Sequence, residues 1–193
     1  MAKVPRSPTE PLQRRIFVPA AKRAAVLLWG EDGLNEIAQK LPDDTREEFF
    51  KIVGTDEWVA ARHVIKWCYV AHHGPGGMSQ PKMREYIDRV FDFSYGVVRR
   101  SMLRMADPVA ITPRVGPIWK EEHTAGELEG AVEAGGKSAL FRLVGSPYTE
   151  TPHTRAGMAE SYRYAYALTR AKNVTETHTL EKPGVLVFRI RWT

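Results

Sequence analysis

The segment 131–138 has the residue types of a phosphate-binding loop, since a small residue and four variable ones precede Gly136, Lys137 and Ser138. Such a loop cradles phosphate oxygens only where a strand leads into it and a helix begins at the Lys-Ser pair. Here residues 139–145 alternate like a strand instead. We therefore expect a hairpin turn with a solvent-facing Lys137, and no nucleotide site.

Metal binding would need several histidine, cysteine or carboxylate ligands at close spacing. The six histidines are His63, His72, His73, His123, His153 and His178. His72 and His73 are adjacent, so in a helix their side chains diverge by about 100°, and a glycine-rich segment follows them. This spacing predicts polar residues at a helix end, with no metal site and no cofactor.

Nucleophilic catalysis would need a serine, cysteine or lysine beside a base that a carboxylate orients. The sequence has no Gly-x-Ser-x-Gly, and its single cysteine, Cys68, lies on the apolar stripe of a predicted helix, where a thiol is buried and unreactive. Four carboxylates surround a predicted helix start, where they complement the helix dipole: Asp43, Asp44, Glu47 and Glu48. We find no catalytic residues and expect a protein that is not an enzyme.

Aromatic side chains recur through the middle of the chain, at Trp58, Trp67, Phe91, Phe93, Tyr95 and Trp119. They can pack as an ordinary core or line an apolar cavity, and the sequence leaves both interpretations open. The ligand pocket of the second interpretation is lined by His63, Trp67, Cys68, Phe91, Tyr95 and Trp119.

Helices must position most of these residues. Apolar residues at helical spacing predict helices at 20–29, 34–41, 45–53, 55–73 and 81–105. The period changes to that of strands near residue 128, and a further helix is predicted at 156–171. Strands are predicted at 128–132, 139–145, 174–180 and 185–192.

The final strand has the clearest pattern. Phe188, Ile190 and Trp192 share one face, and Arg189 and Arg191 share the other. We expect this strand to be central in its sheet. One sheet face should be covered by the late helix and by the long helix near residues 90–98, and the other face should be at least partly wet.

Together these elements predict an α+β fold, in which the helical N-terminal two thirds packs on a small antiparallel sheet formed mainly by residues 126–192. The 193 residues suit a single domain at 15–193, after a disordered or extended tail at 1–14 that contains three prolines. Hydrophobic residues make up 43% of the chain and charged residues 26%, a composition that excludes a chain disordered along its whole length.

Composition also limits the location and the partners. One cysteine permits no internal disulfide, and the sequence has neither a signal-peptide segment nor the ~20-residue apolar run of a membrane helix. We expect a cytoplasmic protein without a membrane span. The net charge of +5 is a mild excess without a nucleic-acid-binding motif, so nucleic acid is not an expected partner.

A family resemblance rests on an ordered set of segments: 29–34, Leu41-Pro42, Trp58, 119–129, 143–147 and 188–192. The set spans most of residues 15–193. It resembles a large paralogous family of myxobacterial proteins, related to the 4-vinyl reductase type of small-molecule-binding domain. More distantly, it is similar to haem nitric-oxide-binding domains and to TRAPP vesicle-tethering subunits.

The departures from these relatives concern their metal and haem sites. Relatives often carry two cysteines before the last strand, whereas the corresponding positions here fall near His178 and at Leu186. The haem branch has an axial histidine and a Tyr-x-Ser-x-Arg motif. Ser161 and Arg163 match that motif, but Ala159 replaces its tyrosine. The resemblance therefore implies no metal at the first site and no haem.

What the resemblance implies is a non-enzymatic sensory or scaffold module, which binds a small apolar ligand or a protein partner and forms a homodimer. A pure protein-interaction subunit with a filled core is the alternative, and an enzyme of unknown class is the third. A cavity larger than about 300 Å³ would favour the first over the second.

Overall fold

The computed structural model describes residues 9–193, except for 56, 76 and 78. Contacts divide the chain into two compact units, Met1–Ser94 and Tyr95–Thr193, called unit 1 and unit 2 below. Most of the expected tail lies outside the described residues. Within the tail's last part, Leu12–Arg14 forms a strand.

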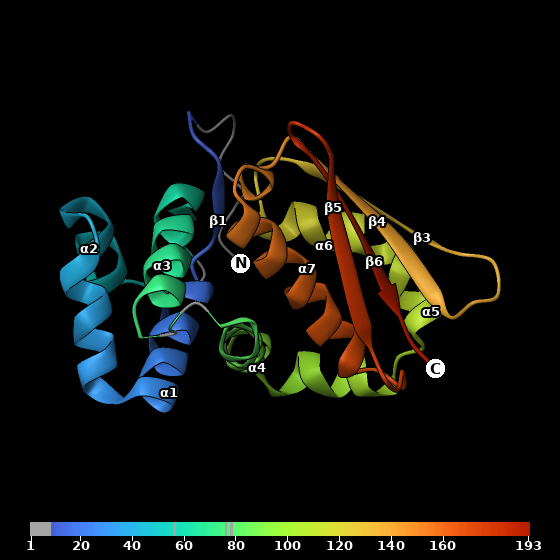
Figure 1. Ribbon diagram of the computed structural model, residues 1–193, viewed down its shortest axis with the longest axis horizontal. Helices are drawn as coiled ribbons and strands as arrows, with labels where there is room; N and C mark the ends of the chain where they lie inside the picture. Colours follow the sequence, from blue (N-terminus) through green and yellow to red (C-terminus); the bar gives the residue numbers. More distant parts are fainter. Residues whose placement is uncertain (1–8, 56, 76, 78) are drawn as a thin grey trace. The chain divides into compact units, whose positions relative to one another are not determined.

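Unit 1 is a helical unit with one small sheet (Figure 1). Its sheet pairs β1 (Leu12–Arg14) antiparallel with β2 (Trp58–Ala60). Its helices are α1 (Phe17–Lys40), α2 (Asp43–Phe50), α3 (Ala61–His73) and the first part of α4 (Gln80–Met105). The helix predicted to begin at residue 55 begins at Ala61 instead, because Trp58 pairs with Arg14 in the sheet.

Alanines allow the helices of unit 1 to approach closely. Ala21, Ala24 and Ala25 on α1 are fully buried, and α1 packs against α3. The indole of Trp67 on α3 stacks on Phe49 at a ring-centroid distance of 4.3 Å. These side chains form part of a buried apolar core in the unit.

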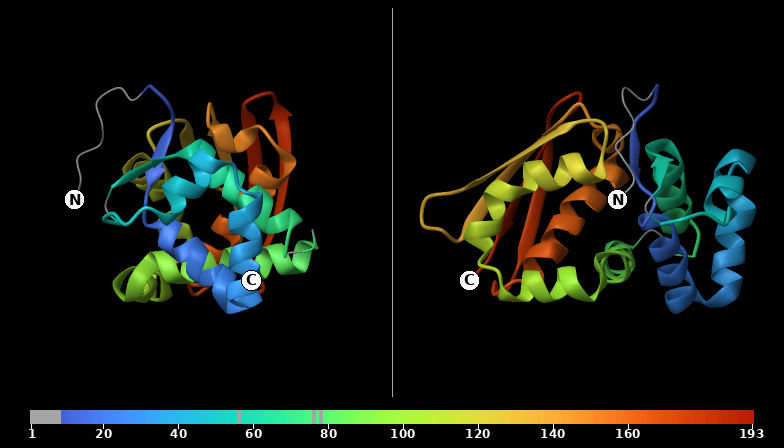
Figure 2. Two further views of the ribbon diagram at one scale, coloured as in Figure 1. Left: turned by 90° about the vertical axis from the view of Figure 1, so that its left-hand side faces the viewer. Right: turned by 180° about the vertical axis from the view of Figure 1, so that it is seen from behind.

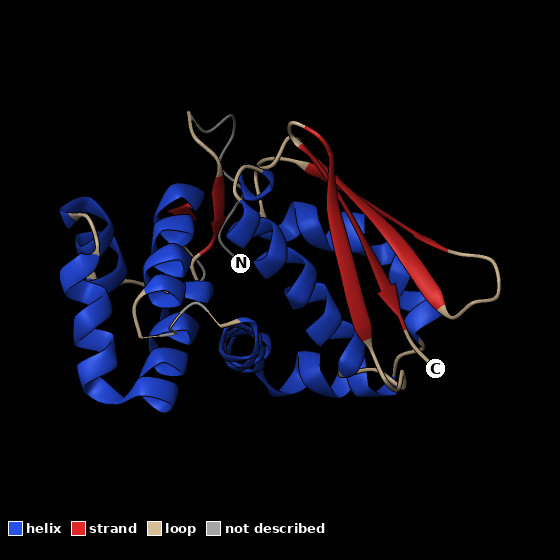
Figure 3. Cartoon of the chain, viewed as in Figure 1, coloured by secondary structure: helices blue, strands red, loops and turns tan. Residues whose placement is uncertain are grey.

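Unit 2 contains an antiparallel sheet with the strand order β3-β4-β6-β5 (Figure 3). Its strands are β3 (Glu127–Val132), β4 (Ser138–Val144), β5 (Thr175–Lys182) and β6 (Val185–Arg191). The second part of α4, α5 (Pro108–Ile111), η1 (Thr112–Arg114) and α6 (Val115–Glu122) precede the sheet, and η2 (Pro147–Thr149) and α7 (Pro152–Ala167) follow β4. The central position predicted for the final strand is confirmed.

Helices cover one face of this sheet (Figure 2). Helix α7 packs on β5 and β6, while α6 and η1 pack on β3. The predicted role of the late helix is therefore confirmed. The predicted cover by the long helix is wrong, because Gly96 adopts a φ of 62° and interrupts α4. Beyond that break, Val98 is exposed instead of packing on the sheet.

Two glycines allow α6 and η1 to lie directly on β3. A Cβ atom at Gly130 would lie 2.8 Å from the Phe141 ring and 2.9 Å from the Val115 side chain. A Cβ atom at Gly116 would lie 2.8 Å from the Leu128 carbonyl oxygen. All three distances are shorter than van der Waals contact, so only glycine fits this packing without a shift.

The architecture confirms the predicted α+β class, with helices toward the N-terminus and the larger sheet toward the C-terminus. The hairpin turn at Gly135 and Gly136 is also confirmed, since both residues adopt positive φ angles between β3 and β4. Among the described helices, none combines the length and the apolar character that crossing a membrane would require.

Candidate functional site

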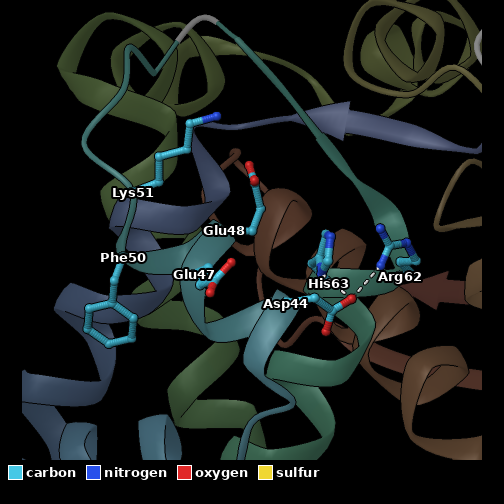
Figure 4. Close-up of a pocket in the computed structure, with 7 residues that line it drawn as sticks. All are labelled: Asp44, Glu47, Glu48, Phe50, Lys51, Arg62 and His63. Carbon is cyan, nitrogen blue, oxygen red and sulfur yellow. Dashed lines mark hydrogen bonds and ion pairs between the residues drawn. The ribbon is translucent and has the colours of Figure 1, made fainter.

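An open pocket of about 670 Å³ lies on unit 1 between α2 and α3. Figure 4 shows Asp44, Arg62 and His63 gathered at one end, and Phe50 and Lys51 at the other. Glu47 and Glu48 lie between them. Asp44, Glu47 and Glu48 stand at i, i+3 and i+4 in α2, a spacing that places side chains on one face of a helix.

The Arg62 guanidinium is held by two carboxylates. It donates to Glu10 and to Asp44, each at 2.8 Å. The hydrogen bond from Arg62 holds the pKa of the Asp44 carboxyl below its usual range, and the two carboxylates raise the pKa of Arg62. The pocket therefore presents a paired cation at this end, and its carboxylate partner is ionised at neutral pH.

His63 lies beneath this ion pair and is buried. Burial lowers the pKa of His63, and the nearby Arg62 charge lowers it further, so the imidazole is neutral at pH 7. Its Nδ1 lies 2.9 Å from the Thr45 hydroxyl and 4.0 Å from an Asp44 oxygen. A catalytic triad needs the hydroxyl at one ring nitrogen and the carboxylate at the other. Because both contact the same nitrogen, these three residues cannot act as a triad.

The opposite side of the pocket continues into a buried ion pair. Arg15 is almost fully buried, and its guanidinium donates to the Glu48 carboxylate and to the Glu48 carbonyl oxygen. The Lys22 ammonium lies 5.1 Å from the centre of the Phe50 ring. Burial and the nearby Arg15 charge lower the pKa of Lys22. The pocket thus holds ordered charges of both signs, as a polar binding surface would.

The residues predicted to line an apolar pocket fall in both units. Within unit 1, Trp67 is fully buried, and its Nε1 donates to the Tyr86 hydroxyl at 2.7 Å. Cys68 packs at the edge of that core, and burial raises the pKa of its thiol to about 12. Phe91 is half-buried, and His63 belongs to the polar pocket.

The remaining two predicted residues, Tyr95 and Trp119, belong to unit 2. The Arg99 guanidinium lies 4.7 Å above the Tyr95 ring and pairs with Glu122. Trp119 is buried and stacks face to face on His123 at a centroid distance of 3.7 Å. The Trp119 indole also donates to two backbone carbonyls. Both aromatic residues are therefore engaged in packing within their unit.

Sequence reasoning assigned the α2 carboxylates to the helix dipole and missed their part in the pocket. The i, i+3, i+4 spacing of Asp44, Glu47 and Glu48 was the available signal. The contribution of Arg62 and His63 could not be found in the same way, because it depends on how α3 packs against α2. Among the described residues, no group of three or more histidine, cysteine or acidic side chains is arranged to hold a metal ion.

Comparison with known proteins identifies the fold. No family model matches the chain, and no curated protein matches it. An oxygen-binding H-NOX domain related to soluble guanylate cyclases aligns with a TM-score of 0.60 and 11% identity, over 93% of this chain and 95% of that domain. This chain has the fold of an H-NOX domain.

Other solved structures agree. An H-NOX protein from S. oneidensis aligns with a TM-score of 0.65 and 13% identity, over 93% of this chain and 96% of that one. A structure from a study of H-NOX activation aligns with a TM-score of 0.58 and 15% identity, over 91% of this chain and 94% of that one. The resemblance to haem nitric-oxide-binding domains is therefore confirmed at the level of the fold.

Proposed function

We propose that this chain is a non-enzymatic sensory or scaffold module that uses the H-NOX fold without haem and acts through a protein partner. The fold carries the proposal, because similarity to H-NOX domains extends over nine-tenths of the chain. The solved neighbours include an oxygen complex and a protein in the Fe(II)NO ligation state, so the fold serves small-ligand recognition in those proteins. Transfer of that role rests on analogy of fold.

The residues of this chain do not fit haem. The positions matched to the Tyr-x-Ser-x-Arg motif lie in α7, where Ala159 is fully buried. The Arg163 guanidinium is buried and paired with the fully buried Glu160 carboxylate, and the Ser161 hydroxyl donates to the Met158 carbonyl. These groups face internal partners of their own helix and are not free to bind a propionate.

Three possible axial ligands are no better placed. Haem iron needs an imidazole, thiolate, thioether or phenolate facing an apolar crevice. His63 bonds to Thr45 in a pocket lined by charges, and Cys68 is a neutral thiol at pH 7. The Nδ1 atom of His123 is buried without a hydrogen-bond partner, but its ring lies flat on Trp119. An iron ligand at His123 would require this stack to open.

The geometry of the pocket supports the non-enzymatic part of the proposal. Thr45 and Asp44 contact the same nitrogen of His63, so the set lacks an activated nucleophile. Phe49 stacks on Trp67 and occupies the space beside the indole, and this favours a protein partner over an apolar ligand at that place. The charged pocket on unit 1 has room for a small polar ligand, and this is the second candidate function.

Native mass spectrometry of the purified chain, combined with a haemin titration, tests the proposal. We expect the mass of a homodimer of the polypeptide, without haem. Haemin should produce no saturable Soret band at one equivalent. His123→Gln and His63→Gln serve as matched variants. A one-to-one haem complex that disappears in one of these variants would refute haem-independent function.

A further inference from the structure

The strand β5 forms one edge of the unit 2 sheet. It pairs with β6 on one side, and no other described strand pairs with its opposite side (Figure 1). Every residue of β5 except Glu176 is exposed. The free edge of a sheet presents backbone N–H and C=O groups that another extended strand can satisfy. The partner that this edge fits is therefore a strand.

The regular part of this edge has two defined ends. Asn173 adopts a φ of 51°, which lies outside the extended conformation of a strand. At the other end, the register with β6 shifts between Leu180 and Lys182, and a β-bulge of this kind ends regular pairing. The segment between the two interruptions covers residues 174–180 and is centred on Thr177.

This segment is complementary to its own reversed copy. An antiparallel copy about a two-fold axis at Thr177 sets hydroxyl against hydroxyl, carboxylate against imidazole and apolar against apolar. Cross-strand threonine pairs and acid–base pairs of this kind stabilise neighbouring strands. The pairs are Thr177 with Thr177, Thr175 with Thr179, Glu176 with His178, and Val174 with Leu180.

Neighbouring registers lose this match. An axis at Glu176 would set two carboxylates directly against each other, which is destabilising. An axis at His178 would set Glu176 against Leu180. Only the axis at Thr177 keeps every pair compatible, and it coincides with the centre of the regular segment. The sequence of the edge and its geometry therefore select the same register.

We propose that β5 pairs antiparallel with β5 of a second copy of this chain, about a two-fold axis at Thr177, so that two four-stranded sheets form one continuous sheet. This inference rests on the homodimer expected under the proposed function, and it names the surface. Leu180, which is 38% exposed, lies opposite Val174 of the second copy in this dimer. Glu176 already lies 3.1 Å from His178 within one chain, and the dimer offers its carboxylate a second imidazole.

The first test is sedimentation of Thr177→Lys. Because Thr177 lies on the axis, the variant sets two lysines directly opposite each other, and the Kd of the dimer should rise at least about tenfold. Ala131→Lys is the matched control, since Ala131 is exposed in the same cross-strand row but on β3, at the other edge of the sheet. That row consists of Ala131, Leu140, Arg189 and Thr177. The control should leave the Kd unchanged, and circular dichroism should show both variants folded.

Cysteine cross-linking tests the register. Directly opposite Cβ atoms in an antiparallel pair lie about 4.5–5.5 Å apart, so Thr177→Cys should form a disulfide between two copies when copper–phenanthroline is added as the oxidant. In Thr179→Cys the two thiols would be four positions apart, roughly 14 Å along the strands, and should remain unlinked. The wild-type chain controls for Cys68.

Three results would overturn the proposal. A wild-type chain that is monomeric at every concentration contradicts both this surface and the expected homodimer, and leaves β5 open to a strand of a different protein. A dimer that persists unchanged in Thr177→Lys, or that cross-links equally through Thr177→Cys and Thr179→Cys, rejects this surface while the homodimer stands. The haemin titration is independent of all three results.

Discussion

Replacing Phe188 by alanine should remove a central part of the unit 2 core. Phe188 is 1% exposed, and its ring lies 4.8 Å from the Phe141 ring and 5.2 Å from the Tyr162 ring, measured between centroids. Because β4 and β5 hold β6 on both sides, the surroundings cannot readily collapse into the space. We expect a loss of about 3–5 kcal/mol in the free energy of unfolding, a large share of the ~5–15 kcal/mol of an ordinary domain.

Urea denaturation followed by circular dichroism measures this loss, with Arg189→Ala as the matched variant. Arg189 is the next residue of the same strand, on the opposite face, where it donates to Glu133 at 2.7 Å. Its removal should change stability far less. The comparison at two protein concentrations shows whether association contributes, because a dimer adds stability by mass action. A Phe188→Ala protein within about 1 kcal/mol of the wild type would refute the assignment of the inward face.

Three further results are expected. Gly130→Ala should lower the free energy of unfolding by about 1–3 kcal/mol, because its Cβ would lie 2.8 Å from the Phe141 ring; Ala131→Ser, at the exposed neighbouring position, should be near neutral in the same urea assay. Burial lowers the pKa of His123 from 6.5 to about 4. As the pH falls from about 6.5 to about 4, the unfolded chain therefore binds a proton at this histidine before the folded chain does, and the free energy of unfolding should decrease. His123→Gln should reduce this loss of stability in denaturation curves measured near pH 6.5 and near pH 4. An unchanged pH profile in this variant would show that His123 does not cause the loss. Calorimetry with ATP and magnesium should detect no binding to the wild type or to Lys137→Ala, whereas micromolar binding that the substitution removes would restore the phosphate-loop interpretation.

Local patterns predicted the sheet of unit 2 well. Alternation and paired glycines mark the β3–β4 hairpin, and the structure places Gly135 and Gly136 at its turn. The last strand alternates so regularly that its central position could be predicted from its two faces. Here each residue's neighbours along the chain carry the information that determines the structure.

Longer-range contacts account for the parts that the sequence did not reveal. Trp58 has helical spacing with later residues, yet it joins a strand because a segment more than 40 positions earlier pairs with it. Apolar spacing along 81–105 continues through Gly96, whose backbone nevertheless interrupts the helix. Val90 is therefore buried in the core of unit 1, whereas Val98 is exposed. The pocket on unit 1 depends on the packing of α2 against α3, and one-dimensional spacing reports only the α2 contribution.

The strand order β3-β4-β6-β5 also determines how the sheet can assemble. Two hairpins, β3–β4 and β5–β6, can each form from neighbouring segments within microseconds. Joining them requires β4 to find β6 across the whole of α7, a contact between distant parts of the chain. Such contacts require chain entropy to be lost before the stabilising contacts have formed, so this docking should limit the folding rate of unit 2. Until it occurs, β4 and β6 each present an open edge that can pair with another chain, and refolding at high concentration should therefore favour aggregation.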